Sequence, residues 1–247
     1  MKRRYKNPPI VEAVCEIHFE SDQLLTASQL LQIGELWKAD YPNQQTVEEK
    51  NLELQVNLGN ATVKTNPLGT RLIARSSDGT RIAQHSMRFL AVNQLKPYPG
   101  WSESFRANIL SRIQDSVELF HFEKVRAVNL RYIDRLDFPQ RPLIWSEWLT
   151  IGLPVPDCIP VAGGNFQFHY QQTLDNGLNV FTNLTTLPPE NPDLTSIILD
   201  ATVVWQGSTP LEKCEELLDS VHAPHPKLFD QMLSEKTQAL LGGYETV

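Results

Sequence analysis

The residues best suited to chemistry are charged side chains on two stretches that alternate like β-strands. Glu12 and Glu16 share one face of the first stretch, and Arg131 and Arg135 share one face of the second. If the two strands are neighbours, carboxylates face guanidinium groups across the sheet. Such a face is either a solvated surface with weak cross-strand ion pairs, or a groove that binds a charged ligand or a polar segment of a partner.

Asp200 interrupts an apolar stretch at residues 197–204, where a buried carboxylate without a partner would be costly. Either it lies on the solvated face of its strand, or it pairs with Arg131 or Arg135. Together with the two glutamates it is also the acid or base candidate if the chain acts on a small anionic molecule. In that case the two arginines are the expected anion ligands.

Familiar catalytic and cofactor-binding signatures are missing from the sequence. It holds no glycine-rich phosphate loop and no G-x-S-x-G, H-E-x-x-H or C-x-x-C motif. His222 and His225 are three residues apart but have no third ligand nearby, so we interpret them as capping and bend-packing residues rather than metal ligands. The sequence therefore predicts no cofactor and no metal, assigns no catalytic residue, and favours a protein that is not an enzyme.

The elements that carry these residues predict an α+β fold built mainly on an antiparallel sheet. Residues 1–140 begin with an alternating strand and a helix that starts with a capping box at Thr26. A run of strands with an Asp78-Gly79 hairpin, an amphipathic helix and a second alternating strand follow. This order predicts a ferredoxin-like unit with an inserted hairpin.

Residues 141–247 predict a β-strand unit that either stands alone or continues the first unit as one domain. It begins with a proline-punctuated connection. Two strands flank a turn at Asp175-Asn176-Gly177, and an apolar strand ends near Trp205. A capping box at Thr209 predicts the start of a helix, and the Pro-His-Pro break at 224–226 predicts a helical hairpin at the carboxyl end.

Composition and charge restrict the setting and the partners of the protein. The chain has 247 residues with 22 Lys and Arg against 29 Asp and Glu, a formal net charge of −7, which repels nucleic acid and suits a basic protein partner. Three separated cysteines, Cys15, Cys158 and Cys214, are typical of free thiols in a reducing compartment. Because no apolar run is long enough for a bilayer and the start lacks an apolar signal core, we expect a cytoplasmic protein without membrane association.

The amino-terminal residues 7–19, NPPIVEAVCEIHF, resemble the opening of an uncharacterised, sporadically distributed family of prokaryotic proteins with the pattern N-P-P-I-x-E-A-x-x-E-I-x-F. Residues 130–135 are similar to a strand of that family, and the carboxyl-terminal segment from His225 is similar to the carboxyl-terminal segment of its members. Asp134 stands where the family usually has Asn. The resemblance implies no known activity, and the sporadic distribution implies only an association with mobile or defence genes.

Two functions are consistent with these features. The first is a non-enzymatic accessory or neutralising protein, linked to a defence or toxin system, that binds a protein partner through the charged strand face and the carboxyl-terminal helices. The second is an enzyme or sensor for a small anionic ligand. RNA binding is disfavoured by the negative charge. Aromatic residues between Tyr132 and Tyr170 predict either core or a contact between copies of the chain in a homo-oligomer.

Overall fold

The computed structural model describes residues 3–21, 25–57, 60–86, 88–139, 143–152, 166–188 and 191–246. The predicted thiol Cys158 lies outside these residues. The strands are β1 Arg3–Tyr5, β2 Ile10–Glu20, β3 Asn43–Asn57, β4 Asn60–Arg75, β5 Arg81–Ser86, β6 Phe89–Leu95, β7 Lys124–Phe138, β8 Gln167–Thr173, β9 Asn179–Thr186, β10 Thr195–Pro210 and β11 Tyr244–Thr246. The helical segments are α1 Ala27–Trp37, the π-helical turn η1 Trp101–Phe105, α2 Arg106–Phe120, α3 Trp145–Trp148, the 3-10 turn η2 Leu211–Lys213, α4 Cys214–His222, α5 Pro224–Met232 and α6 Glu235–Leu240.

A nine-stranded sheet in the order β3-β4-β5-β6-β2-β7-β10-β9-β8 forms the centre of the molecule, and every neighbouring pair is antiparallel. A separate pair, β1 and β11, joins the two ends of the described chain. The predicted α+β class with a mainly antiparallel sheet is confirmed. Strands from both predicted units lie in one sheet, because β7 pairs with β2 on one side and with β10 on the other.

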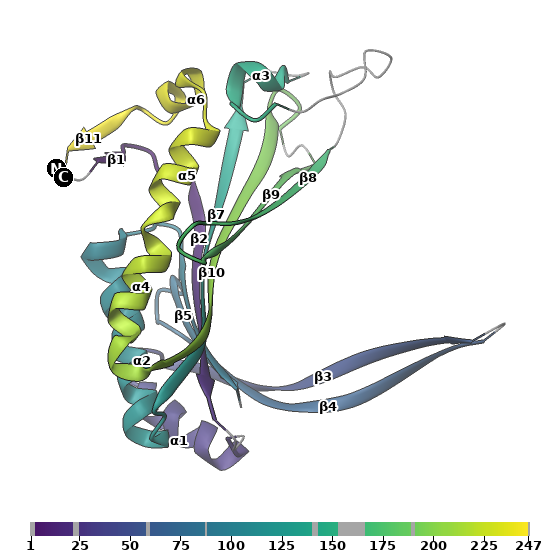
Figure 1. Cartoon of the computed structure of the whole chain (residues 1–247), viewed down its shortest axis with the longest axis vertical. Helices are drawn as coiled ribbons and strands as arrows, with labels where there is room; N and C mark the ends of the chain where they lie inside the picture. Colours follow the sequence, from purple (N-terminus) through teal and green to yellow (C-terminus); the bar gives the residue numbers. More distant parts are fainter. Residues whose placement is uncertain are drawn as a thin grey trace.

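The helices α1, α2, α4 and α5 lie along one face of the sheet (Figure 1). The β3–β4 hairpin projects from the other side, and β8 and β9 bend in that same direction. Alternation explains this arrangement: Ala13, Cys15 and Ile17 of β2 are buried beneath the helices, whereas Glu12 and Glu16 point to the opposite side. We call the side that carries the two glutamates the open face.

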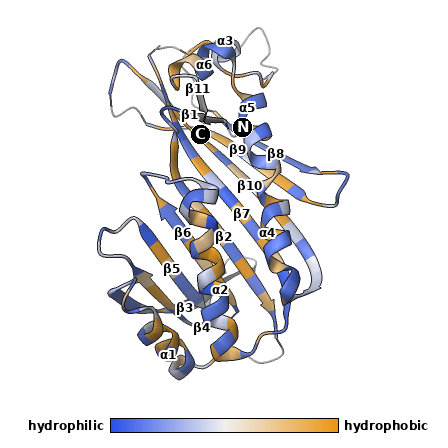
Figure 2. Ribbon diagram, turned by 90° about the vertical axis from the view of Figure 1, so that its left-hand side faces the viewer, coloured by the Kyte–Doolittle hydropathy of each residue, from blue (hydrophilic) through white to orange (hydrophobic). Residues whose placement is uncertain are grey.

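The apolar core lies between the sheet and the helices and consists of two clusters. The larger cluster packs β2, β6 and β7 against α1, α2 and α4, with Trp37, Phe105 and Leu218 among its fully buried members. The smaller cluster packs the far ends of β7 and β10 against α3 and the carboxyl-terminal segment, and it contains Phe138 and Trp148. Figure 2, seen from the helix side, shows the apolar stretches of the central strands behind α2 and α4.

Several local predictions hold at the level of single hydrogen bonds. Thr26 caps α1, because its hydroxyl accepts from the backbone N–H of Gln29 at 3.3 Å while the Gln29 side chain accepts from the backbone N–H of Thr26 at 2.9 Å. The predicted hairpin turns join β4 to β5 and β8 to β9. Gly79 and Gly177 occupy these turns with φ of 74° and 80°, a conformation that side chains disfavour.

The predicted capping box at Thr209 is wrong. Thr209 is still paired with Val125 in the sheet, so β10 runs on to Pro210, and α4 begins only at Cys214 without a side-chain cap. Pairing with β7 satisfies the backbone at Thr209, and this outweighs the local capping signal.

The predicted carboxyl-terminal helical hairpin is not confirmed. Ala223 keeps right-handed helical angles, with φ −51° and ψ −37°, and it both ends α4 and precedes α5. The two helices therefore follow one another in nearly the same direction (Figure 1). Pro224 is accommodated because it occupies the first turn of α5, where its missing N–H has no helical partner to lose.

Candidate functional site

The two charged strands are neighbours, which is the condition for a shared charged face. β2 pairs with β7 so that Val14 lies opposite Arg131 and Glu16 lies opposite Asn129. Side chains alternate between the two faces of a strand, and in this register the side chains of Glu16, Asn129 and Arg131 all project to the open face. The open face therefore gathers acidic and basic groups from adjacent strands.

Arg131 and Asp200 form a bidentate ion pair on the open face. Nε and one terminal nitrogen of Arg131 donate to the two carboxylate oxygens of Asp200 at 2.8 and 2.6 Å. The Asp200 side chain is 11% exposed and that of Arg131 is 47% exposed, so the pair lies at the edge of solvent. The hydrogen bonds to Asp200 raise the pKa of Arg131. Asp200 therefore both lies on the open face and pairs with Arg131, so the two alternatives given by the sequence are true at once.

The two glutamates are held by amides of neighbouring strands. Glu12 accepts a hydrogen bond from Asn93 Nδ2 at 2.7 Å, and Glu16 accepts one from Asn129 Nδ2 at 3.1 Å. His18 lies 3.8 Å from Glu16, and this contact is the main reason that the pKa of Glu16 is lowered. Both carboxylates are therefore set in place as acceptors of side-chain hydrogen bonds.

Arg135 lies farther along β7 than the Arg131–Asp200 pair. Its Nε donates to Asp137 Oδ1 at 3.1 Å, and Ser196 Oγ donates to the same oxygen at 2.5 Å. Each predicted anion ligand therefore has a carboxylate partner of its own, and the two guanidinium groups do not converge on one position.

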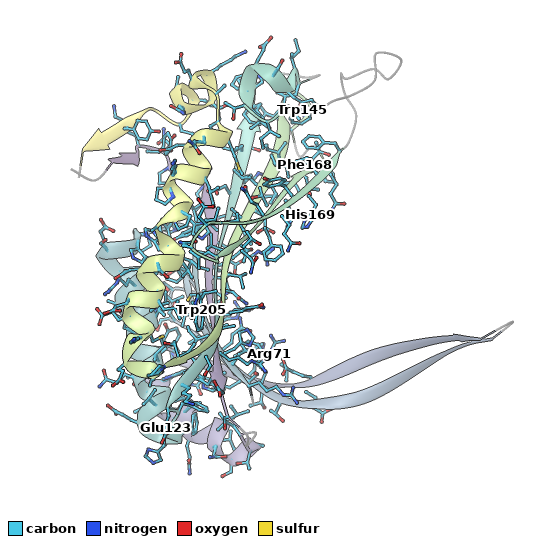
Figure 3. The ribbon with its side chains drawn as sticks, in the orientation of Figure 1. Arg71, Glu123, Trp145, Phe168, His169 and Trp205 are labelled. Carbon is cyan, nitrogen blue, oxygen red and sulfur yellow. The ribbon has the colours of Figure 1, made fainter. Side chains whose placement is uncertain are left out.

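The open face extends well beyond these residues. Figure 3 shows Arg71 at the base of the β3–β4 hairpin and His169 on β8, toward opposite margins of this face. Arg71 pairs with Glu49 at 3.2 Å, and His169 Nδ1 lies 2.6 Å from Asn183 Oδ1. The face is polar and broad, and its charges are largely paired within the sheet.

A pocket of about 520 Å³ lies on the helix side of the sheet. Its floor is formed by β7 and β10, and its walls come from α5, η1, the residues just before β2, and Tyr244 of β11. It therefore sits where the two chain ends and the carboxyl-terminal helices meet the sheet. The sequence predicted no ligand site at this place, although it marked the carboxyl-terminal helices as a surface for a protein partner.

Aromatic rings make much of the pocket wall. Trp101 stacks on His222 with ring centroids 4.3 Å apart and an interplanar angle of 6°. The hydroxyl groups of Tyr98 and Tyr132 are 3.0 Å apart, and the Tyr132 ring meets His225 edge to face at 4.7 Å. The walls thus offer flat apolar surfaces with a few hydroxyl groups.

Asp134 is the most unusual group of the pocket. It is 3% exposed, and no hydrogen bond or ion pair joins its side chain to the residues that the structure describes. Burial raises the pKa of Asp134 to about 8, with a smaller contribution from the charge of Asp200. A buried carboxyl group without a partner is costly, and such groups in folded proteins call for an explanation.

Several other polar groups of the pocket have partners. Tyr5 donates its hydroxyl proton to Asp230 Oδ1 at 2.8 Å, and Tyr244 OH lies 2.8 Å from Tyr5 OH. His225 Nε2 donates to the carbonyl oxygen of Leu130 at 3.0 Å. Burial lowers the pKa of His225 to about 3, so its ring is neutral at pH 7. Asp134 differs from these groups, because it is buried without a hydrogen bond from the described residues.

The sequence did contain a signal for Asp134. Alternate residues of β7, namely Val128, Leu130, Tyr132, Asp134 and Leu136, are all buried on the helix side. An acid within this buried series is unexpected on an apolar face, because burying a carboxyl group is costly.

No protein-family model matches the chain, and the comparison with curated proteins finds no match. Within the residues that the structure covers, none of the helices has both the length and the apolar character needed to cross a bilayer.

Proposed function

We propose that this chain is a binding protein for a small molecule, which occupies the pocket between β7, β10, α5 and η1. The observation that carries the proposal is the Asp134 carboxyl group, buried in the pocket and without a partner among the described residues. Ligand sites are typically concave and mainly apolar, with a few polar groups and a perturbed pKa. A ligand group that pairs with Asp134 would offset the cost of burying its carboxyl group.

A pair of substitutions on β10 tests this proposal. Ala201 lines the pocket, whereas its neighbour Thr202 lies opposite Arg131 on the open face. We expect Ala201→Phe to fill the pocket and remove the thermal stabilisation by ligands found in a small-molecule screen of the wild-type protein. Thr202→Phe places the same ring on the other side of the sheet and should leave that stabilisation unchanged.

The measurement is the shift of melting temperature with ligand concentration, followed by calorimetric titration for the compounds that act. Equal binding by wild-type protein and Ala201→Phe would show that the compounds bind elsewhere. A screen without stabilising compounds would count against a small-molecule function.

We also propose, as a second function, that the open face binds a protein partner in a defence- or toxin-linked system. Support comes from the breadth of the polar face between the β3–β4 hairpin and β8, and from a net charge of −7 that suits a basic partner. Arg131 is available at its centre, because its side chain is 47% exposed despite the ion pair.

The same two variants separate this second function from the first. We expect Thr202→Phe to weaken capture of one defined basic protein from the native host at least tenfold, while Ala201→Phe captures it as the wild type does. Affinity is measured with the purified partner by surface plasmon resonance. An equal effect of both variants, or of neither, would contradict a binding role for the open face.

We propose further that residues 1–140 form a ferredoxin-like unit extended by the β3–β4 hairpin. The strand order β7-β2-β6-β5 supports this, together with a helix after β2 and another before β7. Membership of the prokaryotic family that residues 7–19 resemble, and the cytoplasmic location, remain predictions.

A further inference from the structure

We infer that the pocket binds an organic amine, with its ammonium group beside Asp134 and a flat or apolar body against the aromatic walls. This inference rests on the proposed small-molecule function and adds the chemical class of the ligand. Three features of the pocket carry it: the signs of its charges, the chemistry of its rings, and the position of the buried carboxyl group.

Carboxyl groups lie at every depth of the pocket. Asp134 is buried, Asp230 is half-buried, and Glu103 is exposed at the rim. Among the described residues that line the pocket, none is Lys or Arg. A concave site lined by one sign of charge attracts the opposite sign and repels its own, so a cation is favoured over an anion.

The aromatic rings of the pocket also favour a ligand with a positive charge. Tyr98, Trp101, Tyr132 and Phe229 come from four places in the chain and surround one volume. Aromatic faces carry the negative part of the ring quadrupole, which attracts ammonium groups and also packs against flat apolar groups. An amine with an aromatic body uses both properties.

Asp134 offers the specific contact. Its carboxyl group is buried in a pocket of about 520 Å³ and lacks a hydrogen-bonding partner among the described residues, so a donor from the ligand would satisfy it. An ammonium group beside it favours the ionised carboxylate and forms a charge-assisted hydrogen bond, which is stronger than a neutral one. The structure therefore has a place for one cationic group at the inner end of an apolar ligand.

Three probes with the same indole body test the inference: tryptamine, which is cationic, tryptophol, which is neutral, and 3-indolepropionate, which is anionic. Calorimetric titration at pH 7.5 should show tryptamine binding at least tenfold more tightly than tryptophol, and indolepropionate binding most weakly. In Asp134→Asn the tenfold preference for tryptamine should disappear while tryptophol binds as before. Asp175→Asn is the matched control, because it removes a carboxyl group from the exposed turn between β8 and β9, outside the pocket, and should change tryptamine binding less than threefold.

The outcomes separate the ligand class from the proposed function. If tryptophol or indolepropionate binds as tightly as tryptamine and Ala201→Phe removes that binding, the pocket is a ligand site but the amine class is wrong. If Asp134→Asn keeps the preference for tryptamine, Asp134 is not the cation partner and the inference is overturned. If none of the probes binds at millimolar concentration, the amine proposal fails, and the wider screen described above decides the small-molecule function.

Discussion

Asp134→Asn is expected to gain stability relative to wild type by several kcal/mol as the pH rises from 4 to 9, because the buried wild-type carboxyl group resists ionisation. In the folded protein, burial raises the pKa of Asp134 to about 8. The unfolded chain ionises the same group near its ordinary pKa of about 4. Between these two values the folded state holds a proton that the unfolded state has lost, so wild-type stability falls as pH rises.

The size of the effect follows from the separation of the two pKa values. A difference of about four units corresponds to on the order of 5 kcal/mol at pH 9, where both states are ionised, and to almost nothing below pH 4. The amide in Asp134→Asn does not titrate, and the cost of burying it is independent of pH. The free energy of unfolding of the variant, relative to wild type, should therefore rise steadily from pH 4 to pH 8 and then level off.

Urea unfolding at one-unit steps from pH 4 to pH 9 measures this difference. Asp175→Asn is the control, because it removes one carboxylate from the exposed turn between β8 and β9. Its curve should run parallel to that of wild type. A parallel curve for Asp134→Asn as well would mean that Asp134 ionises normally, and the central observation behind the ligand site would be lost.

Phe138→Ala is expected to lower the free energy of unfolding by about 3 to 5 kcal/mol, the usual cost of deleting a fully buried phenyl ring. Phe138 is 0% exposed at the end of β7 and packs against Trp148 with ring centroids 5.0 Å apart. The same strand places Val128 and Leu130 in the larger core cluster. Because one strand belongs to both clusters, we expect the whole protein to unfold in a single transition.

Far-ultraviolet circular dichroism and tryptophan fluorescence, recorded on the same urea series, check this expectation. Both signals should move to the same lower midpoint in Phe138→Ala. Ile144→Ala, which truncates a side chain that is 47% exposed in the same region, should shift the midpoint only slightly. Two separate transitions in Phe138→Ala would instead support independent units that divide near residue 140.

Alternation and capping sequences predicted strands and helix starts correctly where strand pairing in the sheet did not compete with them. The period of two in β2 and β7 correctly separated Glu12 and Glu16 from the buried Cys15 and Ile17, because one face of each strand is covered by helices. At Thr209 the sequence favours a helix cap, but the residue pairs with Val125 of β7 instead. A local pattern cannot show this pairing, because the partner lies far away in the sequence.

The partners of the predicted charged residues required the tertiary structure. Asp200 had two candidate arginines in the sequence, and the register of β10 on β7 places it against Arg131, while Arg135 finds Asp137 on its own strand. A register is set by the packing of a whole strand, so the identity of one ion pair cannot be read from spacing alone.

The sequence predicted a mainly antiparallel sheet, and its alternation placed the two glutamates on one face of their strand and the two arginines on one face of theirs. Those properties follow from alternation, which each strand carries locally. That Asp134 opens onto an aromatic pocket becomes visible only in the folded protein, because the pocket walls come from α5, η1 and both chain ends. The pocket forms where segments far apart in the sequence pack together, and a local sequence pattern does not show where such segments meet.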